Sequence, residues 1–286
     1  MIPMPLAFTR IIAVLSLTLM SFAAEPRILV HGHRGARAIK PENTIPAFEY
    51  AISVGADVLE MDVAVTKDDV LVISHDPHLN PAICQGLISN ALIRGLTLSE
   101  VRLYDCGSLK DPRFPKQQPV PDTRIPTLDE VLSLSTKGNF EFNIETKIFP
   151  DHPGYTPTPE VFAKMLLRVI HKHKLESRVI LQSFDFRTLH AMKKLAPEIR
   201  RSALYEGSEK SFVEIAQEAD ATIVSPLHTL VTPEQVSAAH AAGLQVVPWT
   251  ANTAEEWDKL IDAKVDAIIS DDPLALIEYL KKRGLR

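Results

Sequence analysis

Short runs rich in β-branched and apolar residues alternate along this chain with stretches of helical period. Asn43-Thr44 can cap a helix through Ser53, with Gly55 as its stop, and residues 159–173 predict another helix opened by a proline. Strands that alternate with helices indicate a parallel sheet whose faces are covered by helices. The nine predicted strands cover residues 28–35, 57–66, 70–76, 140–147, 179–184, 201–205, 221–225, 245–250 and 267–270.

One of these nine strands cannot join a parallel sheet. Residues 57–66 and 70–76 are separated by only a few residues around Asp68, whereas a parallel crossover takes about a dozen residues or more. The return run is therefore predicted to be antiparallel, and pairing around Asp68 sets His75 roughly opposite Glu60. The remaining eight strand–helix units predict an α/β fold, a TIM (β/α)8 barrel with a β-hairpin and an inserted segment after strand two. A doubly wound open sheet is the alternative.

The first 23 residues have the layout of a secretory signal peptide. Arg10 supplies a positive charge, residues 11–20 are an uncharged apolar run, and Ser21-Phe22-Ala23 offers small residues for a signal peptidase. The apolar run is shorter than the about 20 residues that span a bilayer. We therefore expect residues 1–23 to be removed and an exported, periplasmic or secreted barrel domain to occupy residues 28–286. The alternatives are an uncleaved membrane anchor and a buried helix.

The composition of the chain limits the classes of molecule that it is expected to bind. The chain has 36 acidic and 31 basic side chains, a formal net charge of −5, and no basic run that could neutralise nucleic-acid phosphates. We therefore expect no nucleic-acid partner, and Lys281-Lys282-Arg283 is too short a basic end to indicate a membrane role. Two cysteines, Cys84 and Cys106, are too few for a zinc module. Export permits a disulfide between them, although two unpaired thiols fit the sequence equally well.

Acidic side chains gather in the predicted strands. Glu60 and Asp62 lie in the second strand, and Glu145 lies near the end of the next parallel one. Since side chains alternate along a strand, Glu60 and Asp62 share a face, as do Glu145 and Lys147. Three carboxylates that face into a barrel need a compensating charge, which one divalent cation supplies. Oxygen ligands favour Mg²⁺ or Ca²⁺ over Zn²⁺.

Two histidines and two cationic side chains complete the predicted site. His33 ends the first strand and His75 ends the hairpin arm, so both are expected at the carboxyl ends of the barrel strands. A histidine pair can act as general acid and base, which contributes roughly 10²–10⁴ in rate. Arg34 and Lys147 are suited to hold a phosphate and to stabilise its developing charge. The sequence thus predicts metal-assisted phosphate chemistry.

Six short motifs follow one another along the chain. They are His33-Arg34-Gly35, Pro41-Glu42-Asn43-Thr44, Glu60-x-Asp62, His75-Asp76, Glu145-x-Lys147 and Trp249-Thr250. Their order and spacing, including the block HRGxxxxxPENTxxAF, resemble the glycerophosphodiester phosphodiesterase family from about Ile28 to Pro273. The resemblance implies a TIM barrel with a segment inserted after the hairpin, a divalent metal, and hydrolysis of a glycerophosphodiester to glycerol 3-phosphate and an alcohol.

The resemblance also implies a role for each site residue. It assigns metal binding to Glu60, Asp62 and Glu145, acid–base catalysis to His33 and His75, phosphate contacts to Arg34 and Lys147, and packing against the glycerol or alcohol to Trp249. His31 departs from the family, which often has a polar residue other than histidine there, and by alternation it is expected one layer below His33. Attack by the substrate's own glycerol hydroxyl, through a cyclic phosphate, and direct attack by water both remain open.

Other functions could use the same barrel. A lysophospholipase D-like activity on acylated substrates needs an apolar rim, and the expected insertion, residues 77–126 over the mouth of the barrel, contains the apolar stretch GLISNALIRGLTL. That stretch reads equally as a helix packed on the barrel. A catalytically silent binding protein would lack a histidine or a metal carboxylate, and an unrelated metallohydrolase would usually bring several metal-binding histidines. The sequence therefore favours an exported, metal-dependent phosphodiesterase for a small glycerophosphodiester, with no stable membrane insertion of the mature chain and its oligomeric state left open.

Overall fold

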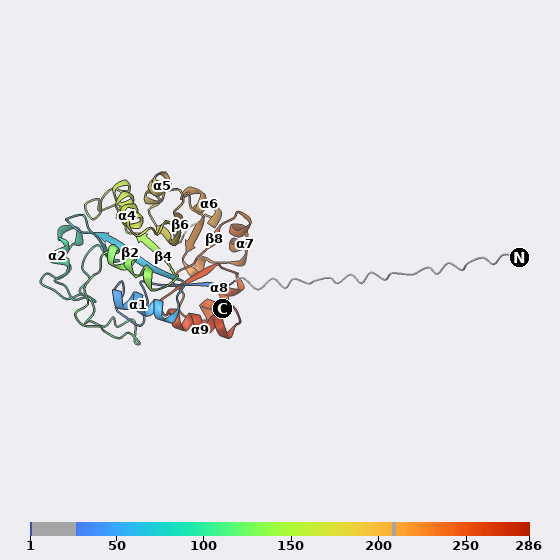
Figure 1. The fold of residues 1–286 in the computed structure, drawn as a ribbon, viewed down its shortest axis with the longest axis horizontal. Coiled ribbons are helices and arrows are strands. Elements are labelled where there is room, and N and C mark those ends of the chain that lie inside the picture. The colour runs from blue at the N-terminus through green and yellow to red at the C-terminus, as the bar shows by residue number, and fades with distance from the viewer. Residues whose placement is uncertain (2–26, 208–209) are drawn as a thin grey trace.

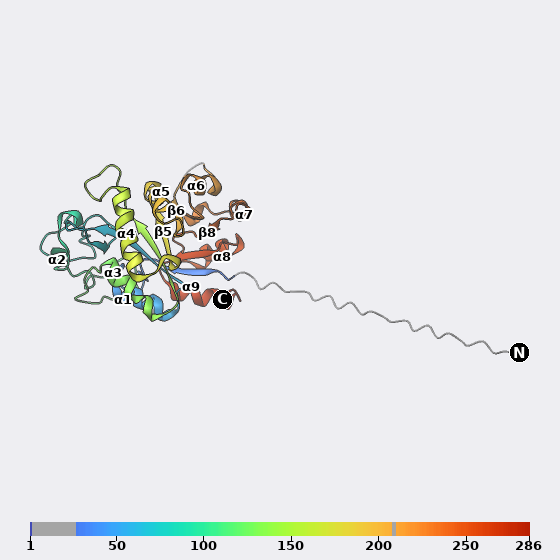
Figure 2. The same cartoon turned by 45° about the horizontal axis from the view of Figure 1, so that its top comes forward.

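The computed structural model describes residue 1, residues 27–207 and residues 210–286, so all but the first residue of the expected signal peptide lies outside the described residues. Figures 1 and 2 show strands at the centre and helices around them. Eight parallel strands follow the order β8-β7-β6-β5-β4-β2-β1-β9, and β3 pairs only with β2. The strands are β1 (Leu29–Gly32), β2 (Val58–Val65), β3 (Leu71–Ile73), β4 (Glu141–Thr146), β5 (Val179–Ser183), β6 (Arg200–Tyr205), β7 (Ile223–Pro226), β8 (Gln245–Val246) and β9 (Ala267–Ser270). The predicted TIM-like barrel is thus confirmed, and the open doubly wound sheet is wrong.

The barrel is nearly closed, with a seam between β8 and β9. Backbone hydrogen bonds cross this seam: the Asp266 amide donates to the Val246 carbonyl at 3.1 Å, and the Ile269 amide donates to the Pro248 carbonyl at 3.0 Å. β8 is two residues long, whereas the sequence predicts a strand over 245–250. Hydrogen bonds to β7 continue past β8, from the Val247 and Trp249 amides, whereas Pro248 lacks an amide hydrogen and cannot donate across the seam to β9.

The surrounding helices begin and end at residues that the sequence favours. Thr44 accepts a hydrogen bond from the Ala47 amide at the start of α1 (Ile45–Val54), and Gly55 ends that helix with a φ of 86°. α4 (Pro159–His173) has the predicted bounds and a proline in its first turn. The other helices around the barrel are α3 (Leu128–Leu132), α5 (Phe186–Leu195), α6 (Phe212–Glu218), α7 (Pro233–Ala241), α8 (Ala254–Asp262) and α9 (Pro273–Lys282).

β2 and β3 form the predicted hairpin. Val63 pairs with Ile73 in an antiparallel register, and the Ser74 amide donates to the Asp62 carbonyl at 3.0 Å. Extended by two residues, this register places His75 within one residue of its predicted partner. The hairpin therefore returns His75 to the part of β2 that carries the acidic side chains.

Residues 77–126 form an irregular segment beside the hairpin. Within this fully described range, the helical elements are the 3-10 helix η1 (Ile93–Gly95) and the one-turn helix α2 (Leu98–Val101), so residues 86–98 do not form one packed helix. The segment has its own apolar cluster, which includes Ala64 and Val72 of the hairpin. A disulfide joins Cys84 to Cys106. Of the two alternatives that the sequence left open, a disulfide or two unpaired thiols, the structure has the disulfide.

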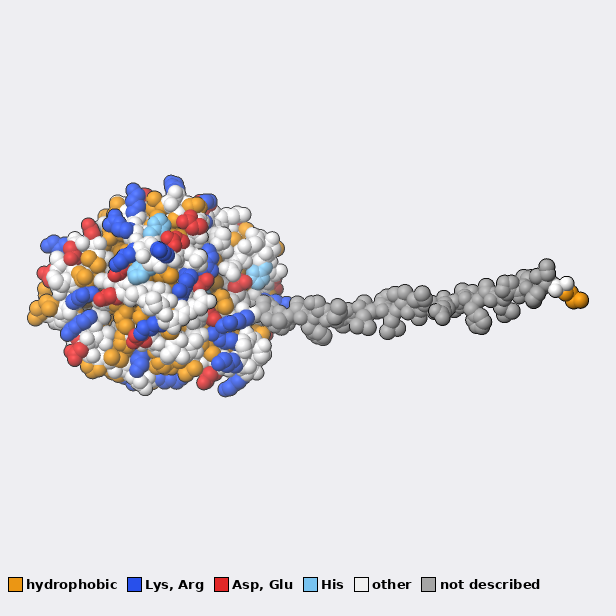
Figure 3. Space-filling view, in the orientation of Figure 1, with side chains coloured by type: hydrophobic (Ala, Val, Ile, Leu, Met, Phe, Trp, Pro, Cys, Tyr) orange, Lys and Arg blue, Asp and Glu red, His pale blue; other side chains and the backbone are white. Residues whose placement is uncertain are grey.

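Apolar side chains fill two regions of the barrel. A large cluster lies between the strands and the helices, and a smaller one inside the barrel contains Ile180, Ile223, Val247, Ala267 and Ile269. On the face seen in Figure 3, acidic and basic side chains are interspersed with apolar ones. Among the helices in the described ranges, none is long and apolar enough to cross a bilayer.

Asp57, just before β2, joins the two ends of the described barrel. Its carboxylate accepts hydrogen bonds from Arg27 at 2.5 Å and from Arg286, the last residue of the chain. The same carboxylate accepts from the Val30 amide of β1 at 2.8 Å. Because Asp57 lies at the amino end of its strand, Arg27 and Arg286, the two ends of the described barrel, lie at the amino-terminal face.

Candidate active site

A cavity of about 290 Å³ opens at the carboxyl ends of the barrel strands. All eight residues predicted for the site line it: His33, Arg34, Glu60, Asp62, His75, Glu145, Lys147 and Trp249. The lining also contains Arg37, Gln182, Phe184, Leu204, Glu206, Thr250 and Ile269. The described insertion, residues 77–126, contributes no residue to this lining. Part of it packs against the hairpin, and another part contacts the loops after β1 and β9, where Gln117 donates to the Arg37 carbonyl at 2.7 Å and Lys116 pairs with Asp272. The expectation that the insertion lies over the mouth of the barrel stays a prediction.

The turn after β1 delivers His33 and Arg34 to the cavity. Gly35 has a φ of 83°, and a Cβ there would lie 2.7 Å from the carbonyl carbon of Ala47 in α1, so the turn requires glycine. Arg34 also has a positive φ, 50°, which is uncommon for a residue with a side chain. Its amide donates to Glu60 Oε2 at 2.8 Å, and this bond ties the turn to β2.

Glu60, Asp62 and Glu145 form a buried acidic cluster in which one oxygen from each lies within 4.8 Å of the others. The parallel register of β2 and β4 sets Asp62 beside Glu145, and Glu60 shares their face two residues earlier. Gln182 donates to Glu60 Oε1 at 2.8 Å, and Asn43 donates to Asp62 Oδ2 at 2.9 Å. These bonds fix the carboxylates of Glu60 and Asp62 within the cluster.

Two cationic side chains contact this cluster. Lys147 Nζ lies 2.6 Å from Glu145 Oε1 and 3.1 Å from Asp62 Oδ1. Arg34 Nη1 donates to Glu42 at 2.7 Å, while its Nε lies 3.2 Å from Asp62 Oδ2 without the alignment of a hydrogen bond. Burial disfavours both charged forms, but the nearby carboxylates outweigh burial and raise the pKa of Arg34 and Lys147. Both side chains therefore remain cationic.

The charges in the cluster fit a bound divalent cation. Burial, together with repulsion from Asp62 and Glu145, raises the pKa of Glu60 well above its usual range. Burial also raises the pKa of Glu145, whereas at Asp62 Lys147 and Arg34 outweigh burial and hold the pKa well below its usual range. Two cationic side chains thus do not compensate three carboxylates. A hard divalent ion would do so, and carboxylate oxygens are the ligands that Mg²⁺ and Ca²⁺ prefer.

His33 is oriented by a carboxylate from the other end of the chain. Its Nδ1 lies 2.5 Å from Asp271 Oδ1, and its Nε2 lies 3.9 Å from Glu60 Oε2. Arg37 and Asn252 donate to Asp271 at 2.6 Å and 2.8 Å. Burial lowers the pKa of His33 to about 4, although Asp271 opposes this effect. Since a carboxylate only accepts, Nδ1 carries the hydrogen and Nε2 remains for the site.

His75 has a carboxylate partner of its own but a wetter environment. Its side chain is 36% exposed, compared with 11% for His33. Its Nδ1 lies 2.8 Å from Asp76 Oδ1. The hydrogen bond from His75 is the main cause of a lowered pKa at Asp76, so Asp76 stays ionised and accepts. The Nε2 atom of His75 is again left for a ligand.

Two aromatic side chains form an apolar part of the cavity. Trp249 Nε1 donates to the Ser225 carbonyl at 2.9 Å, which leaves its ring to pack edge-to-face with Phe184 at a centroid distance of 5.5 Å. The Phe184 side chain is among the exposed large hydrophobic ones. Trp249 therefore lies where a carbon skeleton in the cavity could contact it.

Sequence reasoning missed Asp271 and Gln182 as site residues. Asp271 follows β9 and Gln182 lies near the end of β5, which is the strand position that identified the other site residues. His31, in contrast, lies below His33 as expected. It is buried with Nδ1 3.5 Å from Asn143 Nδ2, and burial lowers its pKa to about 3.

Known proteins share this sequence and this arrangement. Residues 33–275 match the glycerophosphoryl diester phosphodiesterase family. The chain is 34% identical to a glycerophosphodiester phosphodiesterase of Caldanaerobacter subterraneus subsp. tengcongensis over 258 residues, which cover 90% of this chain and 100% of the relative. It is 30% identical over 292 residues to a glycerophosphodiester phosphodiesterase of Bacillus subtilis, with 92% and 95% covered.

Solved structures agree with the sequence comparison. One from Silicibacter pomeroyi, whose name places it among the glycerophosphoryl diester phosphodiesterases, has a TM-score of 0.85 and 28% identity and covers 91% of this chain and 95% of its own. An Oleispira antarctica phosphodiesterase in complex with the product sn-glycerol-3-phosphate has a TM-score of 0.77 and 26% identity, with 89% and 97% covered. The resemblance of the motifs is thus confirmed, and the chain belongs to the glycerophosphoryl diester phosphodiesterase family of enzymes.

Proposed function

We propose that this enzyme is an exported, metal-dependent hydrolase that converts small glycerophosphodiesters to glycerol 3-phosphate and an alcohol. The observation that carries the proposal is the convergence of a buried three-carboxylate cluster, two histidines and two cationic side chains on one cavity. The Oleispira antarctica relative, which was solved with sn-glycerol-3-phosphate as product, supports this substrate class.

Glu60, Asp62 and Glu145 are the residues that would hold one divalent cation, Mg²⁺ or Ca²⁺. Such an ion supplies a fixed positive charge for the phosphate oxygens and for an ionising hydroxyl. The three side chains that would bind the ion are buried, and amide groups of Gln182 and Asn43 donate hydrogen bonds that orient Glu60 and Asp62.

The two histidines divide the proton transfers. His33 Nδ1 is held by Asp271, so Nε2, on the side of Glu60, accepts the proton of the attacking hydroxyl. His75 is the more exposed of the two, and its Nε2 donates a proton to the alcohol that leaves toward solvent. The attacking hydroxyl belongs either to the substrate's glycerol, which gives a cyclic phosphate that water opens, or to water itself.

Arg34 and Lys147 bind the phosphate. Both are cationic, nearly buried and part of the cavity lining, so a phosphate in the cavity would meet both of them. Trp249, with Phe184, packs against the glycerol or the alcohol. Charge and shape therefore select a phosphodiester with a small carbon skeleton.

Acylated substrates are the second candidate considered for this site. The exposed large apolar side chains of the insertion, Leu87, Ile88 and Leu103, lie outside the lining of the cavity. An acyl chain bound in the cavity would therefore have no apolar rim from the insertion to lie on, and deacylated substrates fit better.

The test is release of glycerol 3-phosphate from glycerophosphocholine and glycerophosphoethanolamine with Mg²⁺, Ca²⁺ or EDTA. We expect metal-dependent release that falls by roughly 10²-fold or more in His33→Ala, His75→Ala and Glu60→Ala. His171→Ala, at an exposed position outside the cavity, is the matched control and should keep full activity. Formation of choline and lysophosphatidic acid from lysophosphatidylcholine, with no glycerol 3-phosphate from the deacylated substrates, would favour the lysophospholipase D-like activity. No release from any of these substrates, by folded and metal-loaded protein, would favour a silent binding protein.

Export is tested separately, by mass spectrometry of the chain recovered from its source. We expect a mature chain that begins near Ala24, after the small residues Ser21-Phe22-Ala23. An intact Met1 terminus in a membrane fraction would contradict export by cleavage.

A further inference from the structure

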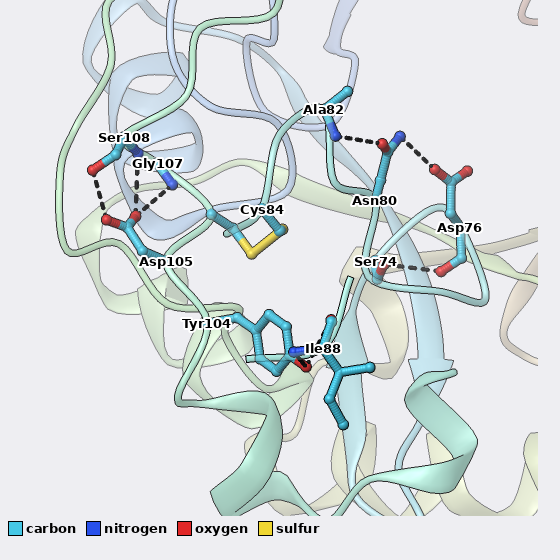
Figure 4. Close-up of a disulfide and its surroundings, with 11 residues drawn as sticks. Ser74, Asp76, Asn80, Ala82, Cys84, Ile88, Tyr104, Asp105, Gly107 and Ser108 are labelled. Atoms are coloured by element: carbon cyan, nitrogen blue, oxygen red, sulfur yellow. Dashed lines mark hydrogen bonds between the residues drawn. A yellow bond between two sulfur atoms is a disulfide. The ribbon is translucent and has the colours of Figure 1, made fainter. Parts of the chain in front are cut away.

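The loop that follows His75 connects this histidine to a disulfide, and Figure 4 shows the part of it from Asp76 to Cys84. His75 Nδ1 lies 2.8 Å from Asp76 Oδ1, and Asp76 Oδ2 accepts a hydrogen bond from Asn80 Nδ2 at 2.9 Å. The Asn80 carbonyl accepts from the Cys84 amide at 2.8 Å, and Cys84 is bonded to Cys106. A continuous path of contacts thus leads from the proposed proton donor into the insertion.

Asn80 is fixed in one orientation by bonds at both ends of its side chain. Its Oδ1 accepts from the Ala82 amide at 3.0 Å, as Figure 4 shows, so its Nδ2 is the group that faces Asp76. An amide nitrogen only donates, which matches the acceptor-only carboxylate of Asp76. Asn80 therefore supports the ionised form of Asp76 at a defined position.

The far end of the disulfide is anchored independently. Gln85 and Asp105, which neighbour the two cysteines, form a backbone bridge with bonds of 2.8 Å and 2.9 Å. The Asp105 carboxylate accepts from the Ser108 hydroxyl at 2.6 Å and from the Gly107 amide at 2.9 Å (Figure 4). The disulfide therefore attaches Cys84 to the turn after Cys106, which the hydrogen bonds of Asp105 hold in place.

Such support matters because the histidine and its carboxylate are both in contact with water. The side chains are 36% exposed at His75 and 41% exposed at Asp76. Solvent competes for an exposed ion pair and weakens it. The hydrogen bond from Asn80 to the second carboxylate oxygen of Asp76 restricts the motion of the His75–Asp76 pair.

We infer that Asn80 is a positioning residue for His75, acting through Asp76, and that the Cys84–Cys106 disulfide holds Asn80 in place. This inference rests on the proposed function, in which His75 donates a proton to the leaving alcohol. Asp76 keeps the hydrogen on Nδ1 of His75, so that Nε2 faces the cavity. The insertion thus contributes to catalysis through the contacts of Asn80 and Asp76 with His75, although none of its residues lines the cavity.

The test compares two leaving groups in the Asn80→Ala variant. Ethanolamine, the alcohol of glycerophosphoethanolamine, needs a proton to leave, whereas p-nitrophenolate, from the p-nitrophenyl ester of glycerol 3-phosphate, leaves without one. Because acid–base catalysis contributes roughly 10²–10⁴, we expect loss of positioning to lower kcat for glycerophosphoethanolamine by about 10-fold, with KM unchanged. The p-nitrophenyl ester should be hydrolysed at nearly the rate of the parent enzyme.

Gln85→Ala is the matched control, since it removes another amide side chain of the insertion that makes no hydrogen bond among the described residues. It should leave both substrates unaffected. Equal rates for Asn80→Ala and the parent on glycerophosphoethanolamine would overturn the inference. Equal losses on both substrates would also overturn it, because they indicate general damage.

The disulfide is tested with the Cys84→Ser/Cys106→Ser variant. We expect the same selective loss on glycerophosphoethanolamine, and no further loss when Asn80→Ala is added, because linked residues are not additive. Additive losses would show that the disulfide acts separately from Asn80, and would overturn the inference that the disulfide holds Asn80 in place. His75→Ala separates the two proposals: full activity in His75→Ala contradicts the proposed function, whereas loss there with none in Asn80→Ala contradicts only this inference.

Discussion

Asp271 contacts His33, a residue 238 positions earlier in the sequence. It lies 2.5 Å from His33 Nδ1 and receives further hydrogen bonds from Arg37 and Asn252. We expect Asp271→Asn to lower kcat by roughly 10²-fold, because an amide no longer favours the hydrogen on Nδ1 and leaves the Nε2 acceptor undefined. Glycerol 3-phosphate release measures this.

The control for Asp271→Asn is Asp262→Asn, at an exposed carboxylate that ends α8 and makes no hydrogen bond among the described residues. It should retain the parent rate. Parent-like activity in folded Asp271→Asn would show that His33 needs no carboxylate partner.

The residues on β2 and β4 could be predicted because strand alternation alone places Glu60, Asp62 and Glu145 on one face. The contact between His33 and Asp271 could not be predicted in the same way. It depends on β9 lying next to β1, which follows from closure of the barrel and leaves no mark on local periodicity. The sequence did place Asp271 directly after a strand, which is a position where site residues are expected, but it did not indicate the contact with His33.

Gly35 illustrates a backbone requirement that is specific to one site. Gly35 and Gly55 have similar φ values, 83° and 86°, but a Cβ meets Ala47 at 2.7 Å in the first case and nothing within 4 Å in the second. We expect Gly55→Ala to cost roughly 1–2 kcal/mol for its backbone conformation. Gly35→Ala should cost roughly 1–3 kcal/mol more for the clash.

Urea unfolding of both variants measures the difference, with the parent as reference. Equal free energies of unfolding for the two variants would show that α1 moves away from the turn at little cost. In that case the close approach at Gly35 would not explain the glycine.

At the scale of elements, the disulfide is the main covalent restraint on the insertion. It closes a sequence separation of 22 residues, and a loop of this size corresponds to about 3 kcal/mol of stabilisation through the unfolded chain. We therefore expect a reductant to lower the urea midpoint of the parent enzyme. The Cys84→Ser/Cys106→Ser variant should start at the lower midpoint and should not respond to reductant.

Elements with a clear period or clear ends were predictable, and the others were not. α4 has the predicted bounds because Pro159 and the apolar stripe define it, whereas β8 is shorter than predicted, although its segment keeps hydrogen bonds to β7 as far as Trp249. Within residues 77–126, the apolar spacing of residues 86–98 fits a helix, but the chain there forms only η1 and the start of α2. The path of this segment beside the hairpin is set by contacts with Ala64 and Val72, which belong to tertiary packing.

For the whole molecule, the bound cation should act as a stabiliser. The ion would join carboxylates of β2 and β4 and offset the burial and the repulsion that together raise the pKa of Glu60. A ligand that binds only the folded state adds about 2.7 kcal/mol at 100 times its Kd. We expect Mg²⁺ or Ca²⁺ to raise the Tm of the EDTA-treated enzyme and to saturate at one ion per chain by calorimetry.

Glu60→Gln is the control for this effect, because it removes one charged oxygen donor and keeps the shape of the side chain. The Tm of that variant should respond little to either ion. An equal rise in Tm for parent and variant would place the ion elsewhere in the molecule.

The contact of both ends of the described barrel with Asp57 has a practical consequence. Arg27 and Arg286 contact Asp57 at the amino-terminal face, whereas the cavity opens at the carboxyl ends of the strands. A resin or electrode coupled through residue 286 would therefore hold the barrel with its opening turned outward. Immobilised in this way, the enzyme should process substrate from the surrounding liquid as freely as it does in suspension.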